Sequence, residues 1–235
     1  MWSSRSFSFW VLSGIVGLSF VFLIAQTQHA ISFVFAFLRN PQQVGSLMPS
    51  SRFVTREGVK AIGFEYQNEG RSLHILEVGA GTGVFTHEIA IKLRPQDHLD
   101  VIELEPELCT LLRKKIEGYP NITLHCISIL DWHPAYRYDA IISSLPFNVF
   151  PVACVRKILD RYKAMLATGG TISYIEYIGG AWVTALCSNQ KERKNVQQIQ
   201  ELLAEFRSGY DVKTACIWIN VPPAYVYHLK CNQAK

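Results

Sequence analysis

The class of fold follows from the stretch Leu76-Glu77-Val78-Gly79-Ala80-Gly81-Thr82-Gly83. The apolar run that includes its start, residues 73–78, predicts a buried strand, and the run 84–93 that follows predicts a helix. Glycines between a strand and a helix let the backbone turn sharply and approach a ligand, and the helix N-terminus presents free N–H groups. The stretch therefore predicts an α/β domain with a cofactor at its first strand–helix turn.

The glycine spacing and the acid before it separate two kinds of cofactor. A dinucleotide fold uses G-x-G-x-x-G to hold a pyrophosphate, whereas the third glycine comes one residue early here, at Gly83. A carboxylate at Glu77 would repel a pyrophosphate, yet it suits a ligand that carries an ammonium and a sulfonium. We therefore expect S-adenosylmethionine, held by Glu77, Gly79, Gly81 and Gly83.

Two further strands supply candidate cofactor contacts. Strand 99–104 carries Glu103 near its C-terminal end, where an acid can accept both ribose hydroxyls. Strand 122–127 is followed by Ser128, at the position where a side chain usually bonds the adenine amino group. Asp131, three residues later, is an alternative, and it equally fits a plain turn.

A fourth strand, 138–142, leads into Ser144 and then into Leu145-Pro146-Phe147-Asn148. Ligands of open α/β sheets lie at the carboxyl ends of the strands, so this loop is expected to face the transferred methyl group. Proline stiffens the loop, its neighbouring carbonyls can accept amine hydrogens, and Phe147 offers a face to an amine's charge. We expect Ser144 to contact the cofactor and the four following residues to form the catalytic acceptor site. The alternative is a proline-rich turn with a buried phenylalanine.

The remaining elements complete a doubly wound, mostly parallel sheet of seven strands. Periodic apolar residues predict helices at 152–166 and 189–207, and a strand is expected at 171–178. Strands 215–221 and 225–230 flank Pro222-Pro223 and are expected to form an antiparallel pair at the sheet edge.

The N-terminus is strongly apolar. Residues 7–25 contain no charge, and as a helix they would extend about 28 Å, close to the roughly 30 Å of a bilayer core. A signal peptide would need a small-x-small cleavage site, which residues 24–30 lack, and a core helix would need a polar face. We therefore expect a membrane anchor over 1–29 and a catalytic domain over 30–235. The apolar segment 31–38 fits either an interfacial helix or a core helix.

The net charge and the cysteine spacing bear on nucleic-acid partners and on metal sites. The net charge of +4 is too small to indicate a nucleic-acid partner. The six cysteines show no C-x-x-C pair and no metal-type spacing, so we expect buried free thiols in a reducing compartment and no metal site.

With these residues in view, the chain resembles the bacterial phospholipid N-methyltransferases, which are similar to rRNA adenine dimethylases. The resemblance runs from about residue 31 to 230 and adds two motifs to the glycine loop and the acceptor loop. One is Pro49-Ser50-Ser51, which follows Phe37-Leu38-Arg39-x-Pro41 through Val44-Gly45-Ser46. The other is Trp218-x-Asn220-Val221-Pro222-Pro223-Ala224. Two departures are that Ser128 replaces the usual aspartate and that the apolar leader exceeds a short amphipathic helix.

The resemblance implies a Rossmann-like class I methyltransferase that methylates the amine of phosphatidylethanolamine at a phospholipid membrane. Because S-adenosylmethionine is made in the cytoplasm, we expect the domain to face the cytoplasm from the bacterial inner membrane. The alternative that the same motifs allow is an rRNA adenine N6-methyltransferase.

Overall fold

The structure is a computed structural model that describes residues 52–63, 70–178, 190–220 and 223–231. All of these belong to the second of two compact units in the chain, Gly45–Lys235. The predicted anchor, 1–29, and the apolar segment 31–38 lie outside the described residues. Within the described part, no helix combines the length and apolar character needed to cross a membrane.

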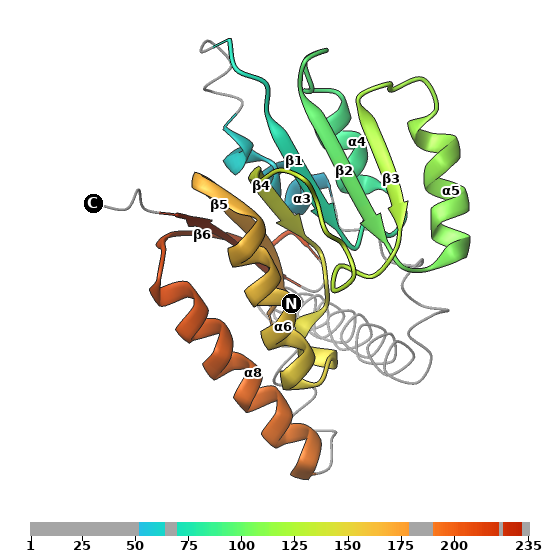
Figure 1. The fold of residues 1–235 in the computed structure, drawn as a ribbon. Helices are drawn as coiled ribbons and strands as arrows, with labels where there is room; N and C mark the ends of the chain where they lie inside the picture. The colour runs from blue at the N-terminus through green and yellow to red at the C-terminus, as the bar shows by residue number, and fades with distance from the viewer. Residues whose placement is uncertain (1–51, 64–69, 179–189, 221–222, 232–235) are drawn as a thin grey trace, which may run out of the picture. The chain divides into compact units, whose positions relative to one another are not determined.

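The described strands form one seven-stranded sheet (Figure 1). In chain order they are β1 (His74–Val78), β2 (His98–Glu103), β3 (Ile122–Cys126), β4 (Tyr138–Ser143), β5 (Leu166–Tyr177), β6 (Asp211–Ile217) and β7 (Ala224–Lys230). Across the sheet they lie in the order β3-β2-β1-β4-β5-β7-β6. The first five are parallel, and β7 is antiparallel to both β5 and β6. The predicted mostly parallel sheet with an antiparallel edge pair is confirmed.

Helices cover both faces of the sheet, which makes it doubly wound. They are α3 (Arg52–Gly58), α4 (Val84–Ala90), α5 (Pro106–Ile116), α6 (Val152–Met165) and α8 (Gln190–Ser208), with short 3-10 turns η1 (Lys60–Ile62) and η3 (Phe147–Val149). Successive strand residues alternate between two cores. On β1, Ile75 packs into the core of α3, α4 and α5, whereas Leu76 packs into the core of α6 and α8.

Two strand starts differ from the prediction. β5 begins at Leu166, directly after α6, and not at residue 171, because Leu166 already pairs with Tyr138 before a register shift. Gly169 lies in this irregular stretch with φ +74, a conformation that glycine adopts without strain. β6 spans Asp211–Ile217, four residues before the predicted 215–221, since it pairs residue for residue with β7 up to Ala224.

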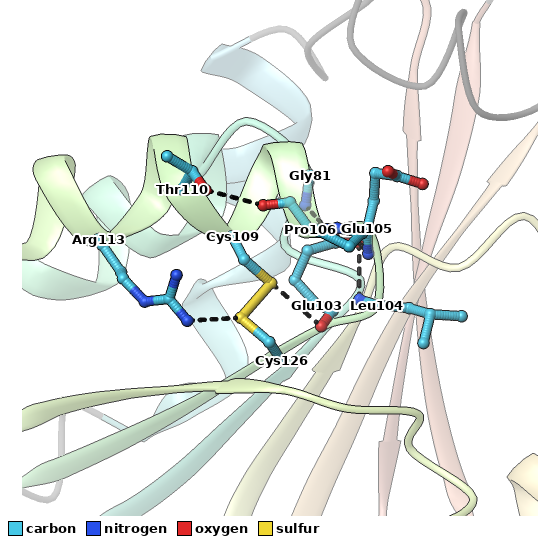
Figure 2. Close-up of a disulfide and its surroundings, with 9 residues drawn as sticks. All are labelled: Gly81, Glu103, Leu104, Glu105, Pro106, Cys109, Thr110, Arg113 and Cys126. Atoms are coloured by element: carbon cyan, nitrogen blue, oxygen red, sulfur yellow. Dashed lines mark hydrogen bonds between the residues drawn. A yellow bond between two sulfur atoms is a disulfide. The ribbon is translucent and has the colours of Figure 1, made fainter.

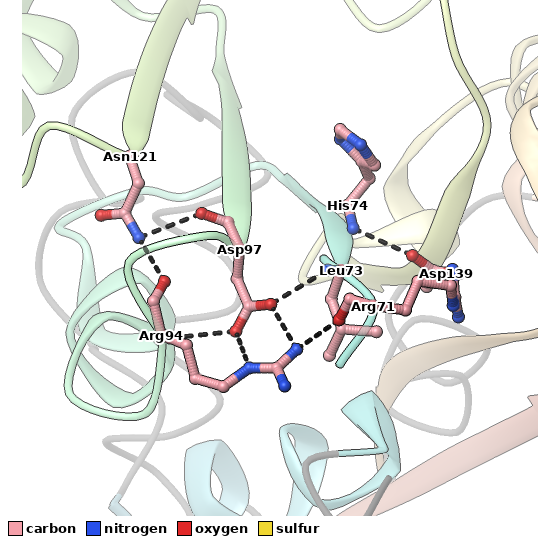
Figure 3. A network of polar contacts seen from close by, with 7 residues as sticks. All are labelled: Arg71, Leu73, His74, Arg94, Asp97, Asn121 and Asp139. Carbon is pink, nitrogen blue, oxygen red and sulfur yellow. Dashed lines mark hydrogen bonds and ion pairs between the residues drawn. The ribbon is translucent and has the colours of Figure 1, made fainter. Parts of the chain in front are cut away.

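An ion pair between Arg94 and the buried Asp97 fixes the amino ends of the first three strands (Figure 3). The Asp97 carboxylate accepts hydrogen bonds from the Leu73 backbone N–H at 3.0 Å and from Arg94 Nη2 at 2.8 Å. The Asn121 amide donates to the Arg94 and Asp97 carbonyls. Burial alone would raise the pKa of Asp97, but the hydrogen bonds from Arg94 and Leu73 outweigh it and lower that pKa below its ordinary value. The network lies at the amino edge of the sheet, and the predicted cofactor site lies at the opposite, carboxyl edge.

The expectation of free thiols is wrong for one pair, because Cys109 and Cys126 form a disulfide (Figure 2). No sequence spacing reveals this pair, since the β2–α5–β3 path brings together residues 17 positions apart. Three other cysteines in the described segments, Cys154, Cys216 and Cys231, form no disulfide and are half-buried. Those segments also contain no cluster of histidine, cysteine or acidic side chains that could hold a metal ion.

Candidate active site

The glycine loop connects β1 to α4 at the carboxyl edge of the sheet. Gly79 and Gly81 have φ values of +74 and +57, which residues with a Cβ rarely adopt. A Cβ on Gly81 would meet no atom within 4 Å, so this residue borders open space. A Cβ on Gly79 would lie 2.7 Å from the Leu145 side chain. Gly81 therefore leaves room for a ligand, and Gly79 allows the acceptor loop to approach the glycine loop.

Glu77 lies at the base of this loop and is fully buried. Its Oε2 accepts a 2.7 Å hydrogen bond from the Thr86 hydroxyl, whereas its Oε1 is buried without a hydrogen-bond partner. Burial raises the pKa of Glu77 from 4.5 to about 8, and the nearby Glu103 adds to this, although hydrogen bonds from Thr86 oppose it. A buried oxygen that lacks a partner fits a cationic group, such as the ammonium of S-adenosylmethionine.

Glu103 ends β2 beside the glycine loop and is 8% exposed. Its Oε2 accepts a 2.7 Å hydrogen bond from the Gly81 N–H, and its Oε1 accepts the N–H groups of Leu104 and Glu105 at 2.8 and 3.0 Å (Figure 2). Its carboxylate is thus held between the two turns that meet at the predicted ribose position. Leu104, which sequence reasoning missed, is 68% exposed and offers an apolar surface for a purine at this edge.

Ser144 ties the acceptor loop to the glycine loop. Its N–H donates to the Val78 carbonyl at 3.1 Å, and its hydroxyl donates to the Gly79 carbonyl. The Leu145 side chain packs against Gly79, as the close approach of its Cδ2 requires. The structure therefore brings the glycine loop, Glu103 and the start of the predicted acceptor loop together.

The rest of the acceptor loop is more tightly bonded than expected. The Leu145 carbonyl accepts the Phe147 N–H at 3.0 Å, and the Pro146 carbonyl accepts the Val149 N–H at 3.1 Å. Each carbonyl keeps a second lone pair, so an incoming amine can still donate to it. The Asn148 side chain accepts a 2.9 Å hydrogen bond from Gln200 on α8. The loop is therefore a rigid turn that helix α8 supports.

The predicted open face of Phe147 needs correction. Its side chain is 4% exposed and packs edge-on against Tyr174, with ring centroids 5.9 Å apart. The ring lies in the core shared with α6 and α8, because β5 passes beneath the loop. The buried phenylalanine of the alternative reading is thus what the structure shows.

The two candidates for the adenine contact lie in the turn after β3. The Ser128 hydroxyl accepts the Leu130 N–H at 3.2 Å, and the Asp131 N–H donates to the Ser128 carbonyl at 2.9 Å. The Asp131 side chain is exposed. Both residues stabilise the turn, and an adenine contact by either stays a prediction.

Sequence reasoning missed a polar and aromatic cluster beside the acceptor loop. Tyr174 and Tyr227 stack with centroids 5.1 Å apart, and the Arg207 guanidinium lies 4.6 Å above the Tyr227 ring. Arg207 donates to the Tyr174 hydroxyl at 2.6 Å and lies 3.7 Å from Glu176 Oε2. The sequence pattern that could have revealed this cluster is the spacing of Tyr174 and Glu176 in β5. Residues two positions apart in a strand lie on the same face, which here is the face that α8 covers.

Residues 75–170 match the protein family described as "Methyltransferase domain". They include the glycine loop, Glu103 and the acceptor loop, which lie together at the carboxyl edge of the sheet. This segment is a class I methyltransferase domain. The cofactor of the domain is S-adenosylmethionine, in agreement with the orphaned Glu77 oxygen and the open space at Gly81.

Among curated proteins, the methyltransferase is similar to the ornithine lipid N-methyltransferase of Singulisphaera acidiphila. The two are 29% identical over 149 residues, which cover 61% of this chain and 75% of the relative. It is also similar to an rRNA adenine N-6-methyltransferase of Lysinibacillus sphaericus, 32% identical over 103 residues that cover 43% of this chain and 38% of that protein.

Solved structures agree on the fold of the methyltransferase. The crystal structure of the N-methyltransferase NodS from Bradyrhizobium japonicum WM9 superposes with a TM-score of 0.55. It covers 78% of this chain and 99% of NodS at 14% identity, so the likeness concerns the fold alone.

Proposed function

We propose that the enzyme transfers the methyl group of S-adenosylmethionine to the amine of a membrane-lipid head group, with phosphatidylethanolamine as the first candidate. The observation that carries this proposal is the similarity to the ornithine lipid N-methyltransferase, which extends over three quarters of that relative's length. An amine on a lipid is the acceptor common to that relative and to the phospholipid N-methyltransferases that the sequence resembles.

The site suits an amine acceptor in three ways. The acceptor loop packs on Gly79, so an amine held there lies beside the cofactor position. The second lone pairs of the Leu145 and Pro146 carbonyls can accept N–H groups and orient the nitrogen. The β5–β7 cluster, in which Arg207 already pairs with Glu176 and covers the Tyr227 ring, packs through Tyr174 against Phe147 and keeps the acceptor loop in place.

Catalysis of this kind requires little beyond positioning. The bound cofactor supplies an electrophilic methyl group on a sulfonium, and the amine must be neutral to attack it. The rigid turn at residues 144–149 would hold the nitrogen in line with the carbon–sulfur bond. Closing the site to water strengthens the interactions of Glu77 and Glu103 with the cofactor.

A membrane partner agrees with an exposed apolar pair at the same edge of the sheet. Trp218 and Ile219 are 70% and 73% exposed and directly follow β6. Because β6 and β5 are both antiparallel to β7, β6 ends at the same carboxyl edge as β5, on the side of the active site. Tryptophan and isoleucine at this position suit the interfacial region of a bilayer. With an anchor in residues 1–29, this would place the site at the cytoplasmic face of the inner membrane.

The second candidate is rRNA adenine N6-methylation, which the match to the Lysinibacillus sphaericus enzyme favours. That match covers a smaller share of the relative than the lipid match does. The net charge of +4 also gives weak attraction to a phosphate backbone.

One experiment separates the candidates. The purified full chain is incubated with methyl-labelled S-adenosylmethionine and, in parallel, with phosphatidylethanolamine vesicles, ornithine lipid vesicles, phosphatidylcholine vesicles and rRNA. We expect label in phosphatidylethanolamine, or in ornithine lipid if that lipid is the acceptor. We expect no label in phosphatidylcholine, because its nitrogen is fully methylated. Label in rRNA and in no lipid would overturn the proposal.

A further inference from the structure

The disulfide between Cys109 and Cys126 takes no part in the proposed reaction, yet it borders the cofactor site. Cys109 lies in the first turn of α5 and is 1% exposed, whereas Cys126 is the last residue of β3 and is exposed. In Figure 2 the bond links α5 to the end of β3 beside Glu103.

Both cysteines contact the residue that the ribose is expected to reach. Cys126 is the register partner of Glu103 in the parallel pair of β2 and β3. The Cys109 Sγ lies 3.5 Å from the Glu103 carbonyl oxygen, and the Cys109 N–H donates to the Glu105 carbonyl at 2.9 Å. The bond closes a covalent ring of residues 109–126. This ring borders the turn at Leu104 and Glu105, whose N–H groups hold the Glu103 carboxylate.

The surroundings of Cys126 favour a reactive sulfur. The Arg113 Nη2 lies 3.3 Å from the Cys126 Sγ, and a guanidinium at this distance stabilises a thiolate. Cys126 is also exposed, so a soluble oxidant can reach it, while its partner is already in place behind it. Disulfides of reducing compartments are usually of this transient, sensing kind.

We propose that Cys109 and Cys126 form a site of reversible thiol oxidation that sets the affinity of the enzyme for its cofactor. The oxidant class is a small disulfide such as glutathione disulfide. The Cys126 thiolate attacks one of its sulfurs, which forms a mixed disulfide and releases one glutathione thiolate. The Cys109 thiolate then attacks Cys126 Sγ and releases the second glutathione. The two cysteines lose two protons and two electrons, and the oxidant gains them as two thiols.

The oxidised state holds the turn after Glu103 in the conformation described, with the carboxylate fixed between Gly81 and residues 104–105. Reduction frees the first turn of α5 from the end of β3, so this carboxylate has to be ordered again when the cofactor binds. We therefore expect the reduced enzyme to bind S-adenosylhomocysteine about fivefold more weakly than the oxidised enzyme.

The test uses the full chain in two states, one treated with glutathione disulfide and one with a phosphine reductant. Peptide mapping without reduction reports whether residues 109 and 126 are linked, and calorimetry with S-adenosylhomocysteine gives the dissociation constant of each state. Because it measures cofactor binding, the result does not depend on which acceptor the enzyme methylates.

Two variants complete the test. Cys126→Ser should bind with the reduced-state affinity whatever the treatment, and the control Cys154→Ser should respond as the wild type does. Arg113→Gln should slow the formation of the linked peptide. If the linked peptide never forms in the wild type, or if the two states bind equally well, the proposal is wrong. Both outcomes are measured on the wild type, so they stand even if the Cys126→Ser protein does not fold.

Discussion

Glu103 is bonded to three backbone N–H groups, those of Gly81, Leu104 and Glu105. Such an arrangement fixes the position of the carboxylate at the predicted ribose site. Replacing one acceptor oxygen by an amide should remove a charge-assisted hydrogen bond. We expect Glu103→Gln to weaken binding of S-adenosylhomocysteine by roughly tenfold to a hundredfold, as measured by calorimetry.

The matched control for this change is Glu105→Gln, two residues away, whose carboxylate makes none of these bonds. It should leave the affinity within about twofold of the wild type. If both variants lose affinity equally, the ribose assignment of Glu103 is wrong and the effect belongs to the turn as a whole.

The raised pKa of the buried Glu77 predicts an unusual dependence of stability on pH. Its pKa is about 8 in the folded chain against an ordinary 4.5, so between these values the folded state holds a proton that the unfolded state has lost. The contribution of Glu77 to the free energy of unfolding therefore falls as the pH rises from 4.5 to 8, by an upper bound of about 4–5 kcal/mol.

Glu77→Gln should remove this slope, because glutamine keeps an oxygen for the Thr86 hydroxyl and carries no proton to lose. Denaturant unfolding without cofactor at pH 5 and pH 8 measures the effect. The variant should gain stability relative to the wild type at pH 8 and differ little at pH 5. The exposed Glu107→Gln serves as control, and an identical slope in wild type and Glu77→Gln would refute the assignment.

At the scale of elements, α8 supports the acceptor loop through its polar face. The Asn195 side chain donates to the Phe150 carbonyl at 2.9 Å and accepts the Val152 N–H at 3.1 Å. It therefore binds the end of the acceptor loop and the start of α6 together. We expect Asn195→Ala to reduce the free energy of unfolding by about 1–2 kcal/mol, as measured by denaturant titration.

Gln198→Ala provides the comparison, because this residue lies on the same helix and is exposed. It should change stability by less than about 0.5 kcal/mol. Equal losses in the two variants would mean that helix propensity, and not the contact with the acceptor loop, explains the effect.

Sequence patterns predicted the helices and strands whose apolar residues follow a clear period. Helix α6, predicted over 152–166, spans Val152–Met165, since a proline precedes it and an apolar stripe runs through it. The strands β1 to β4 end within one residue of expectation. β6 was misplaced because its first four residues, 211–214, are exposed and mostly polar. The apolar residues 217–219, on which the prediction rested, lie partly in the following loop.

The site was predictable where the position of a residue at a strand end is enough to place it. Glu77, the glycines and Glu103 lie at strand ends, and strand polarity alone places them together. The burial of Phe147 depends on Tyr174 from a later strand, and the disulfide depends on a distant helix and strand lying close. Contacts of this kind are set by tertiary packing, which no local pattern encodes.

At the scale of the whole molecule, the carboxyl edge is where the enzyme is proposed to meet the membrane. Changing Trp218 and Ile219 together to serine should lower the rate on phosphatidylethanolamine vesicles by about tenfold, because the interfacial burial of two large apolar side chains is lost. The rate on the same lipid in detergent micelles should change little, since the site itself is intact. Labelled product measures both.

The control is Ile91→Ser. Ile91 is 58% exposed and follows α4, which runs back from the glycine loop toward the opposite edge of the sheet. It should leave the vesicle rate unchanged. A loss of equal size in micelles and vesicles for the double variant would contradict a role in membrane contact.

The position of β7 has a consequence for how the protein is made. This strand is synthesised after β6, yet it lies between β5 and β6 and is the neighbour through which β6 joins the sheet. While the ribosome has not yet released residues 224–230, β5 has an open edge and β6 has nothing to pair with. The nascent chain therefore passes through a stage with an unprotected strand edge, which is the feature that promotes aggregation. Translation stopped before Ala224 should leave the polypeptide in that state, dependent on a chaperone.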